Sequence, residues 1–215
     1  MSDTDRVVPI VIPPAGLQGI LGLPGAASGL VLFAHGSGSG RLSPRNNKVA
    51  SALRQAGLGT LLFDLLTAAE AADRRNVFDI PLLAERLLQA MSLVRQREET
   101  ASLPIGCFGA STGAAAALVA AAGAGRDVAA VVSRGGRPDL AAAVLPKVES
   151  PTLLIVGGAD DVVIDLNRQA LARLTCEKRL VVVAGAGHLF EEPGALEQVV
   201  AHALRWFLHH FTASA

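Results

Sequence analysis

The segment Gly109-Ala110-Ser111-Thr112-Gly113 has the form G-x-S-x-G and lies between an apolar run and an alanine-rich stretch. In such a strand-to-helix turn a serine is held with its hydroxyl exposed, and small neighbours are needed because the turn presses against adjacent elements. The free N–H groups at the start of a helix also favour an anion that develops nearby. The pattern therefore predicts that Ser111 is a nucleophile.

A serine hydroxyl is a weak nucleophile until a base takes its proton, so the hypothesis requires a histidine and an acid. Asp160 follows the apolar run 152–156, and His188 follows the apolar run 180–183. Asp161 competes for the role of the acid, but the spacing Gly157-x-x-Asp favours Asp160. We therefore expect Ser111, Asp160 and His188 to act together.

The other histidines favour different roles. His202, His209 and His210 lie on or after the final expected helix, where a solvated surface position is the simpler interpretation. His35 ends an expected strand and opens the glycine-rich stretch His35-Gly36-Ser37-Gly38-Ser39-Gly40.

That glycine-rich stretch could stabilise the negative oxygen formed during attack. Glycine lets the backbone approach a substrate closely, and the expected donors are the backbone N–H groups of Ser37 and Thr112, which form an oxyanion hole. Glycine-rich turns after strands also bind phosphates, but G-K-[ST] is absent and G-x-G-x-x-G is not matched. The oxyanion interpretation is therefore preferred.

Polar residues near the same edge are candidates for substrate contacts. Arg134 and Arg137 follow an expected strand and could hold an anionic substrate group, or they could pair with Asp139 or Asp160. Asn46 opens an expected helix, where it could contact substrate or simply be solvated. Loops at the carboxyl ends of parallel strands are where open sheets bind ligands.

Short Val-, Ile- and Leu-rich runs alternate with amphipathic stretches, which indicates an α/β fold. The first two expected strands favour an antiparallel hairpin, and the later, continuously apolar ones favour parallel strands buried on both faces. The expected strands are 7–12, 16–23, 30–35, 60–65, 105–109, 128–133, 152–157 and 179–184, and helices are expected from Pro44, around residues 83–94, at 114–124 and around 196–207.

Composition excludes several classes of protein. The chain has 215 residues, 51% of them hydrophobic, and equal numbers of acidic and basic residues, 19 each. Disordered chains have low hydrophobicity and high net charge, and nucleic-acid-binding domains usually have an excess of basic residues. The composition therefore disfavours both classes. The two cysteines, Cys107 and Cys176, form no CxxC pair, which disfavours a disulfide framework or a structural zinc site. No signal peptide or membrane span is recognised, so one cytoplasmic domain over residues 1–215 is expected.

Together, His35-Gly36, the Ser111 turn, Asp160 and His188 resemble an α/β-hydrolase, and the compact form is similar to the dienelactone hydrolase family. The resemblance covers essentially the whole chain and implies a three-layer fold with an eight-stranded, mostly parallel sheet. Because only about 18 residues separate the sixth and seventh expected strands, it also implies that no lid domain is inserted. Typical dienelactone hydrolases have a cysteine nucleophile, an acid in the oxyanion loop and an arginine soon after the histidine, whereas this chain has none of the three.

The residues predict a serine hydrolase that cleaves small carboxylic esters or lactones through an acyl-enzyme intermediate. Thioester, amide or phosphotriester cleavage by the same residues is an alternative, and so is a non-catalytic binding protein, because a fold alone does not prove activity. This chemistry needs no metal or organic cofactor. The expected partner is the small-molecule substrate, with no nucleic acid or membrane, and a homodimer is permitted.

Overall fold

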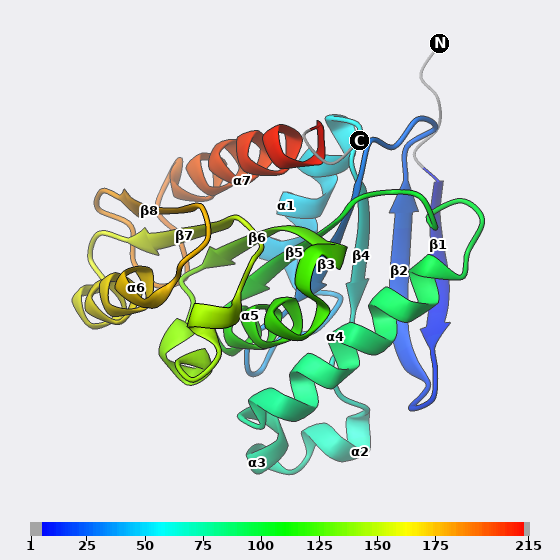
Figure 1. The fold of residues 1–215 in the computed structure, drawn as a ribbon, viewed down its shortest axis with the longest axis horizontal. Helices are drawn as coiled ribbons and strands as arrows, with labels where there is room; N and C mark the ends of the chain where they lie inside the picture. The colour runs from blue at the N-terminus through cyan, green and yellow to red at the C-terminus, as the bar shows by residue number, and fades with distance from the viewer. Residues whose placement is uncertain (1–5, 213–215) are drawn as a thin grey trace.

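The computed structural model describes residues 6–212, which form an eight-stranded sheet in the order β1-β2-β4-β3-β5-β6-β7-β8 (Figure 1). The two pairings β1–β2 and β2–β4 are antiparallel, and all others are parallel. The strands are β1 (Arg6–Ile12), β2 (Leu17–Leu23), β3 (Leu30–Ala34), β4 (Gly59–Phe63), β5 (Ile105–Ala110), β6 (Val128–Arg134), β7 (Thr152–Gly157) and β8 (Lys178–Val183). The predicted hairpin and the predicted parallel strands are confirmed.

Helices cover both faces of the sheet. The helices are α1 (Pro44–Gln55), α2 (Ala68–Ala71), α3 (Arg74–Val77), α4 (Ile80–Arg95), α5 (Thr112–Ala124), α6 (Asp161–Arg173) and α7 (Ala195–Thr212). One buried apolar cluster joins α1 and α7 to the sheet, and another joins α4 and α5 to the opposite face. Figure 1 shows α1 and α7 above the sheet, with α4, α5 and α6 below it. The three-layer α/β architecture is as predicted.

The central helix α5 packs closely on the sheet because small residues lie at their contact. A Cβ atom at Gly113 would lie 2.1 Å from the carbonyl oxygen of Ala34, and one at Gly109 would lie 2.4 Å from Cα of Ala114. Both distances are shorter than any van der Waals contact. Glycines at these positions therefore set how closely α5 approaches β3 and β5, and this closeness holds the turn at Ser111.

Some helices were not expected from the sequence. The segment 64–79, for which no helix was expected, contains the short helices α2 and α3, each of four residues, and four residues are too few to show a helical period. Thr67 starts α2 with a capping box, in which its hydroxyl accepts from the Glu70 N–H and the Glu70 carboxylate accepts from the Thr67 N–H. Helix α6 was also not expected, because its buried face includes Asn167, a polar residue that is fully buried and interrupts the apolar pattern.

Three predicted strands end earlier than expected, because His35, Leu65 and Ala184 lie outside the sheet. Residues 135–151, which connect β6 to β7, are all described and hold only two short 3-10 turns, Pro138–Ala141 and Leu145–Lys147. The predicted absence of a lid between these strands is confirmed. Among residues 6–212, no helix combines the length and apolar character needed to cross a membrane.

Candidate active site

Ser111 lies in the sharp turn between β5 and α5. Its backbone has φ 52° and ψ −122°, a conformation that is costly for a residue with a side chain and is found mainly where function requires it. The Ser111 carbonyl accepts hydrogen bonds from the backbone N–H groups of Ala114 (3.1 Å) and Arg137 (3.1 Å). The surrounding structure therefore holds the strained turn that the G-x-S-x-G pattern predicts.

Asp160 and His188 contact each other at the carboxyl ends of β7 and β8. His188 Nδ1 lies 2.7 Å from Asp160 Oδ2, with the Asp160 side chain 18% exposed and that of His188 39% exposed. If Nδ1–H donates to the carboxylate, the lone pair of Nε2 is left free to accept a proton. Asp161 instead opens α6 with an exposed side chain, so the geometry agrees with the choice of Asp160.

The segment after β6 contacts both sides of the candidate site. The Ser111 N–H donates to the Arg134 carbonyl at 3.4 Å. A Cβ atom at Gly135 would lie 3.0 Å from the His188 carbonyl oxygen and 3.5 Å from His188 Nδ1. Ser111 and His188 therefore pack against one stretch of four residues, although they are 77 residues apart in the chain.

The predicted oxyanion loop packs directly on Ser111. A Cβ atom at Gly36 would lie 2.9 Å from Cβ of Ser111, so only glycine lets the loop come this close. The Asp64 carboxylate accepts from the Arg41 N–H at 2.8 Å and forms an ion pair with the Arg41 side chain. Asp64, which directly follows β4, therefore stabilises the loop that precedes α1.

His35 is a second residue that positions this loop. His35 Nδ1 lies 3.0 Å from the Gly36 carbonyl, and Nε2 accepts from the Leu65 N–H at 3.0 Å. Burial lowers the pKa of His35, against opposing effects of the Gly36 hydrogen bond and the Asp64 charge. A neutral imidazole fits this arrangement, because one nitrogen must donate and the other must accept.

A cavity of about 590 Å³ opens beside the loop. Ser37 and Thr112, the two predicted oxyanion donors, both line it, and their role as donors stays a prediction. Half of the remaining lining residues are apolar and come from the segment that runs from β4 into α4: Leu65, Leu66, Ala68, Ala71, Val77, Phe78 and Leu83. Ser111, Asp160 and His188 are not part of its lining, but Ser111 directly precedes the lining residue Thr112 in the chain.

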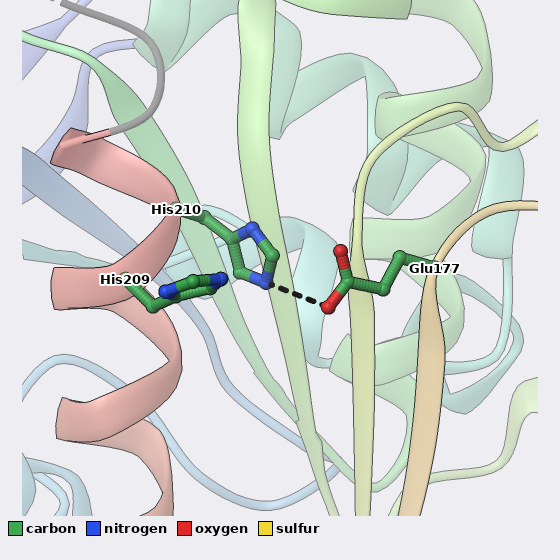
Figure 2. A group of neighbouring side chains, drawn as sticks. All are labelled: Glu177, His209 and His210. Carbon is green, nitrogen blue, oxygen red and sulfur yellow. Dashed lines mark ion pairs between the residues drawn. The ribbon is translucent and has the colours of Figure 1, made fainter.

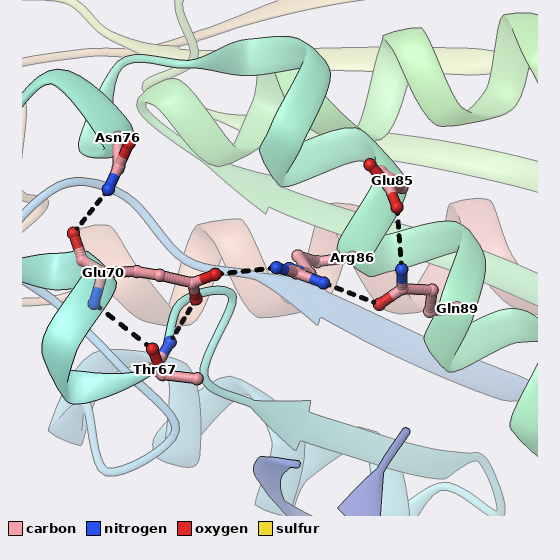
Figure 3. A network of polar contacts seen from close by, with 6 residues as sticks. All are labelled: Thr67, Glu70, Asn76, Glu85, Arg86 and Gln89. Carbon is pink, nitrogen blue, oxygen red and sulfur yellow. Dashed lines mark hydrogen bonds and ion pairs between the residues drawn. The ribbon is translucent and has the colours of Figure 1, made fainter. Parts of the chain in front are cut away.

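A polar network fixes the short helices α2 and α3, which line the cavity (Figure 3). The Glu70 carboxylate accepts from Thr67 N at 2.8 Å and pairs with Arg86 of α4 at 2.7 Å. The Glu70 backbone carbonyl accepts from Asn76 of α3 at 2.8 Å. The Thr67 backbone bond is the main reason why the pKa of Glu70 is lowered, and Arg86 adds to it. Two very short helices are thus fixed to a long one.

Arg134 and Arg137 behave differently. Arg137 donates to both carboxylate oxygens of Asp139, at 2.9 and 2.8 Å, which is one of the predicted pairings. The predicted pairing with Asp139 or Asp160 is wrong for Arg134. This residue is 8% exposed, and its Nε and Nη1 have no hydrogen-bond partner among the described residues. Burial, with repulsion from Arg45, lowers the pKa of Arg134 to about 10. The guanidinium is therefore still charged at neutral pH.

Two further expectations about exposure are wrong. Asn46 is 2% exposed and not solvated, because it lies on the face of α1 that packs on the sheet. His210 is 5% exposed, because it continues the stripe of Ala203 and Phe207 on α7. Neither Arg134 nor Asn46 lines the described cavity, so their contact with substrate stays a prediction.

Cys107 lies inside β5, as expected for a small buried apolar residue. Complete burial raises the pKa of its thiol to about 12, so the thiolate that nucleophilic chemistry requires does not form at neutral pH. Ser111 is therefore the nucleophile candidate of this turn.

Comparisons with known proteins agree with this fold. A family model described as alpha/beta hydrolase domain matches residues 27–210. The chain is similar to the crystal structure of a dienelactone hydrolase from Anabaena variabilis, with 52% identity, a TM-score of 0.93, and coverage of 98% of this chain and 99% of that one. Est1E from Butyrivibrio proteoclasticus shares the fold, with a TM-score of 0.80 and 15% identity over 98% of this chain and 100% of its own.

Two curated relatives come from Mycobacterium tuberculosis and are provisionally named phosphoribosyl transferases. They are 56% identical over 206 residues, which is 96% of this chain but 46% of each relative. This chain therefore spans about half the length of the curated relatives it matches. The family match and the Anabaena structure, by contrast, cover most of the chain, and they show that it belongs to the α/β-hydrolase family, among the proteins that resemble dienelactone hydrolase.

Proposed function

We propose that this protein is a serine hydrolase that cleaves small carboxylic esters or lactones through an acyl-enzyme intermediate. The observation that carries the proposal is the 2.7 Å contact between His188 and Asp160, at the edge of the sheet where Ser111 occupies its strained turn. A histidine oriented by a carboxylate is the base that a serine nucleophile requires.

In the proposed mechanism, His188 Nε2 takes the proton from Ser111 Oγ as Oγ forms a bond to the substrate carbonyl carbon. The carbonyl oxygen becomes negative and accepts hydrogen bonds from the backbone N–H groups of Ser37 and Thr112; losing one such donor typically costs about 3 kcal/mol. The C–O bond of the ester then breaks, and His188 protonates the departing oxygen. Water attacks the acyl-enzyme by the same steps, which releases the acid and restores Ser111.

The cavity supports a substrate with an apolar part. Its volume of about 590 Å³ is within the usual range for small-molecule sites, about 300–1,000 Å³, and most of the Leu65–Phe78 residues that line it are apolar, with Thr67 and Arg74 as the polar ones. One apolar group of the ester would lie in this cavity, with the carbonyl at the Ser37 and Thr112 end.

Other functions use the same residues. Thioester, amide and phosphotriester cleavage differ in the bond attacked, and a dienelactone hydrolase-like phosphotriesterase from metagenomic libraries shares this fold at 18% identity. The phosphoribosyl transferase name belongs to proteins about twice as long as this chain, and it does not follow from the geometry around Ser111.

The proposal is tested by labelling the purified protein with a fluorophosphonate probe. We expect labelling of the native chain, none of Ser111→Ala, and full labelling of the control Ser92→Ala, which alters an exposed serine of α4. A chain-length series of p-nitrophenyl esters should then show turnover with a maximum at one acyl length. A folded native protein that is not labelled would overturn the proposal and favour the binding protein.

A further inference from the structure

Three potential metal ligands lie close together near the start of β8, at the end of the parallel strands opposite the candidate active site. Glu177 lies in the turn before β8, and His209 and His210 lie in the last turn of α7. Figure 2 shows the ring of His210 directed at the Glu177 carboxylate, with the His209 ring beside it. These three residues are the group of at least three possible ligands found among residues 6–212.

Their spacing is that of ligands around one ion. His210 Nε2 lies 3.7 Å from Glu177 Oε1, which is too long for a hydrogen bond. A tetrahedral zinc ion with bonds of about 2.0–2.2 Å separates neighbouring ligand atoms by about 3.4 Å. One ligand atom from each of the three side chains lies within 4.8 Å of the others, so small rotations of exposed side chains would bring all three to bonding distance.

One ligand is rigid and two are adaptable. The His210 side chain is 6% exposed and packs against the Trp206 ring, with the ring centroids 4.5 Å apart and the planes at 64°. Trp206 in turn donates its indole N–H to the Pro151 carbonyl at 3.3 Å. The Glu177 side chain is 59% exposed, but its backbone is fixed, because its carbonyl accepts from Thr152 N at 2.8 Å.

The donor set selects the class of metal. Two imidazole nitrogens and one carboxylate oxygen are the ligands of zinc and neighbouring transition metals, whereas magnesium and calcium take oxygen ligands. We propose that Glu177, His209 and His210 form a zinc site that joins the end of α7 to the start of β8, with water as the fourth ligand. The site is independent of ester hydrolysis, which occurs at the other edge of the sheet.

The test is calorimetric titration of the untagged, chelator-treated full chain with zinc chloride and, separately, magnesium chloride. We expect one zinc per chain with a micromolar Kd and no magnesium binding. His209→Ala and Glu177→Gln should each weaken zinc binding at least tenfold. Both residues are exposed, so these variants should fold normally. The control His202→Ala, on the same helix and outside the cluster, should bind zinc like the native chain.

Thermal unfolding supplies a second readout. Because a ligand that binds only the folded state stabilises it, zinc should raise the Tm of the native chain and of His202→Ala but not that of Glu177→Gln. Zinc binding that persists in both ligand variants would overturn the proposal. So would binding that is lost in His188→Ala but kept in His209→Ala, because this would place the ion at the opposite edge.

Discussion

Asp160 is the residue whose chemistry depends most on a single contact, its 2.7 Å approach to His188 Nδ1. Asp160→Asn keeps the size of the side chain but removes the carboxylate that orients and stabilises the imidazolium. We expect the kcat for a p-nitrophenyl ester to fall on the order of 10³–10⁴-fold, with an unchanged circular dichroism spectrum. Asp161→Asn is the matched control and should stay within about twofold; a larger loss there than in Asp160→Asn would reverse the assignment.

The lowered pKa of His35 predicts how the stability of the protein depends on pH. Because burial lowers its pKa below the unfolded value of 6.5, the unfolded chain binds a proton at a higher pH than the folded chain does. The contribution of neutral His35 is therefore complete above pH 6.5 and is lost as the pH falls through the folded-state pKa.

Urea unfolding at pH 8.0 and pH 5.5 measures this contribution. We expect the native chain to lose more stability between the two pH values than His35→Gln does. The difference between the two proteins cancels the effects of His202 and His210, whose pKa values are also lowered, mainly by burial. Equal losses in both proteins would show that His35 does not titrate in this way.

At the scale of elements, helix α5 contains two glycines with opposite surroundings. A Cβ atom at Gly113 would lie 2.1 Å from the Ala34 carbonyl oxygen, whereas one at Gly123 meets nothing within 4 Å. Gly113→Ala should destabilise the protein by about 1–3 kcal/mol or more through overpacking. Gly123→Ala should stabilise it by about 0.5–1 kcal/mol, because alanine loses less entropy in a helix.

Chemical unfolding of both variants measures these two free energies. The Gly113→Ala variant should also lose esterase activity, since α5 would move away from β3 and the turn at Ser111 would shift. If Gly113→Ala were as stable as the native chain, the close approach of α5 to the sheet would not be what holds the turn.

At the scale of the whole molecule, α7 closes one face of the sheet through its aromatic residues. Phe207 is fully buried and lies where a Cβ atom at Gly106 would meet its ring at 2.6 Å. Phe207→Ala should cost about 3–5 kcal/mol of unfolding free energy. Phe78→Ala, which alters a phenylalanine that is 51% exposed, should cost far less. Similar losses in the two variants would contradict this account of the core.

Much of the architecture could be predicted because its signals are local. The eight strands were recognisable as apolar runs ended by glycine, proline or aspartate, and their bounds differ from the observed ones by at most two residues. The choice of Asp160 also came from short-range spacing. Helices α2 and α3 were not predictable, because a four-residue helix has no period and depends on contacts such as Glu70 with Arg86.

Sequence alone determined the order of the strands along the chain, the turn at Ser111 and the identity of the candidate acid and base, because propensities and turn chemistry act over a few residues. Tertiary structure decided which side chains meet. It brought His188 to Asp160, placed the β4–α4 segment over the cavity, buried Arg134 and Asn46, and directed His210 towards Glu177. These outcomes depend on the packing of elements far apart in the chain, which no local pattern encodes.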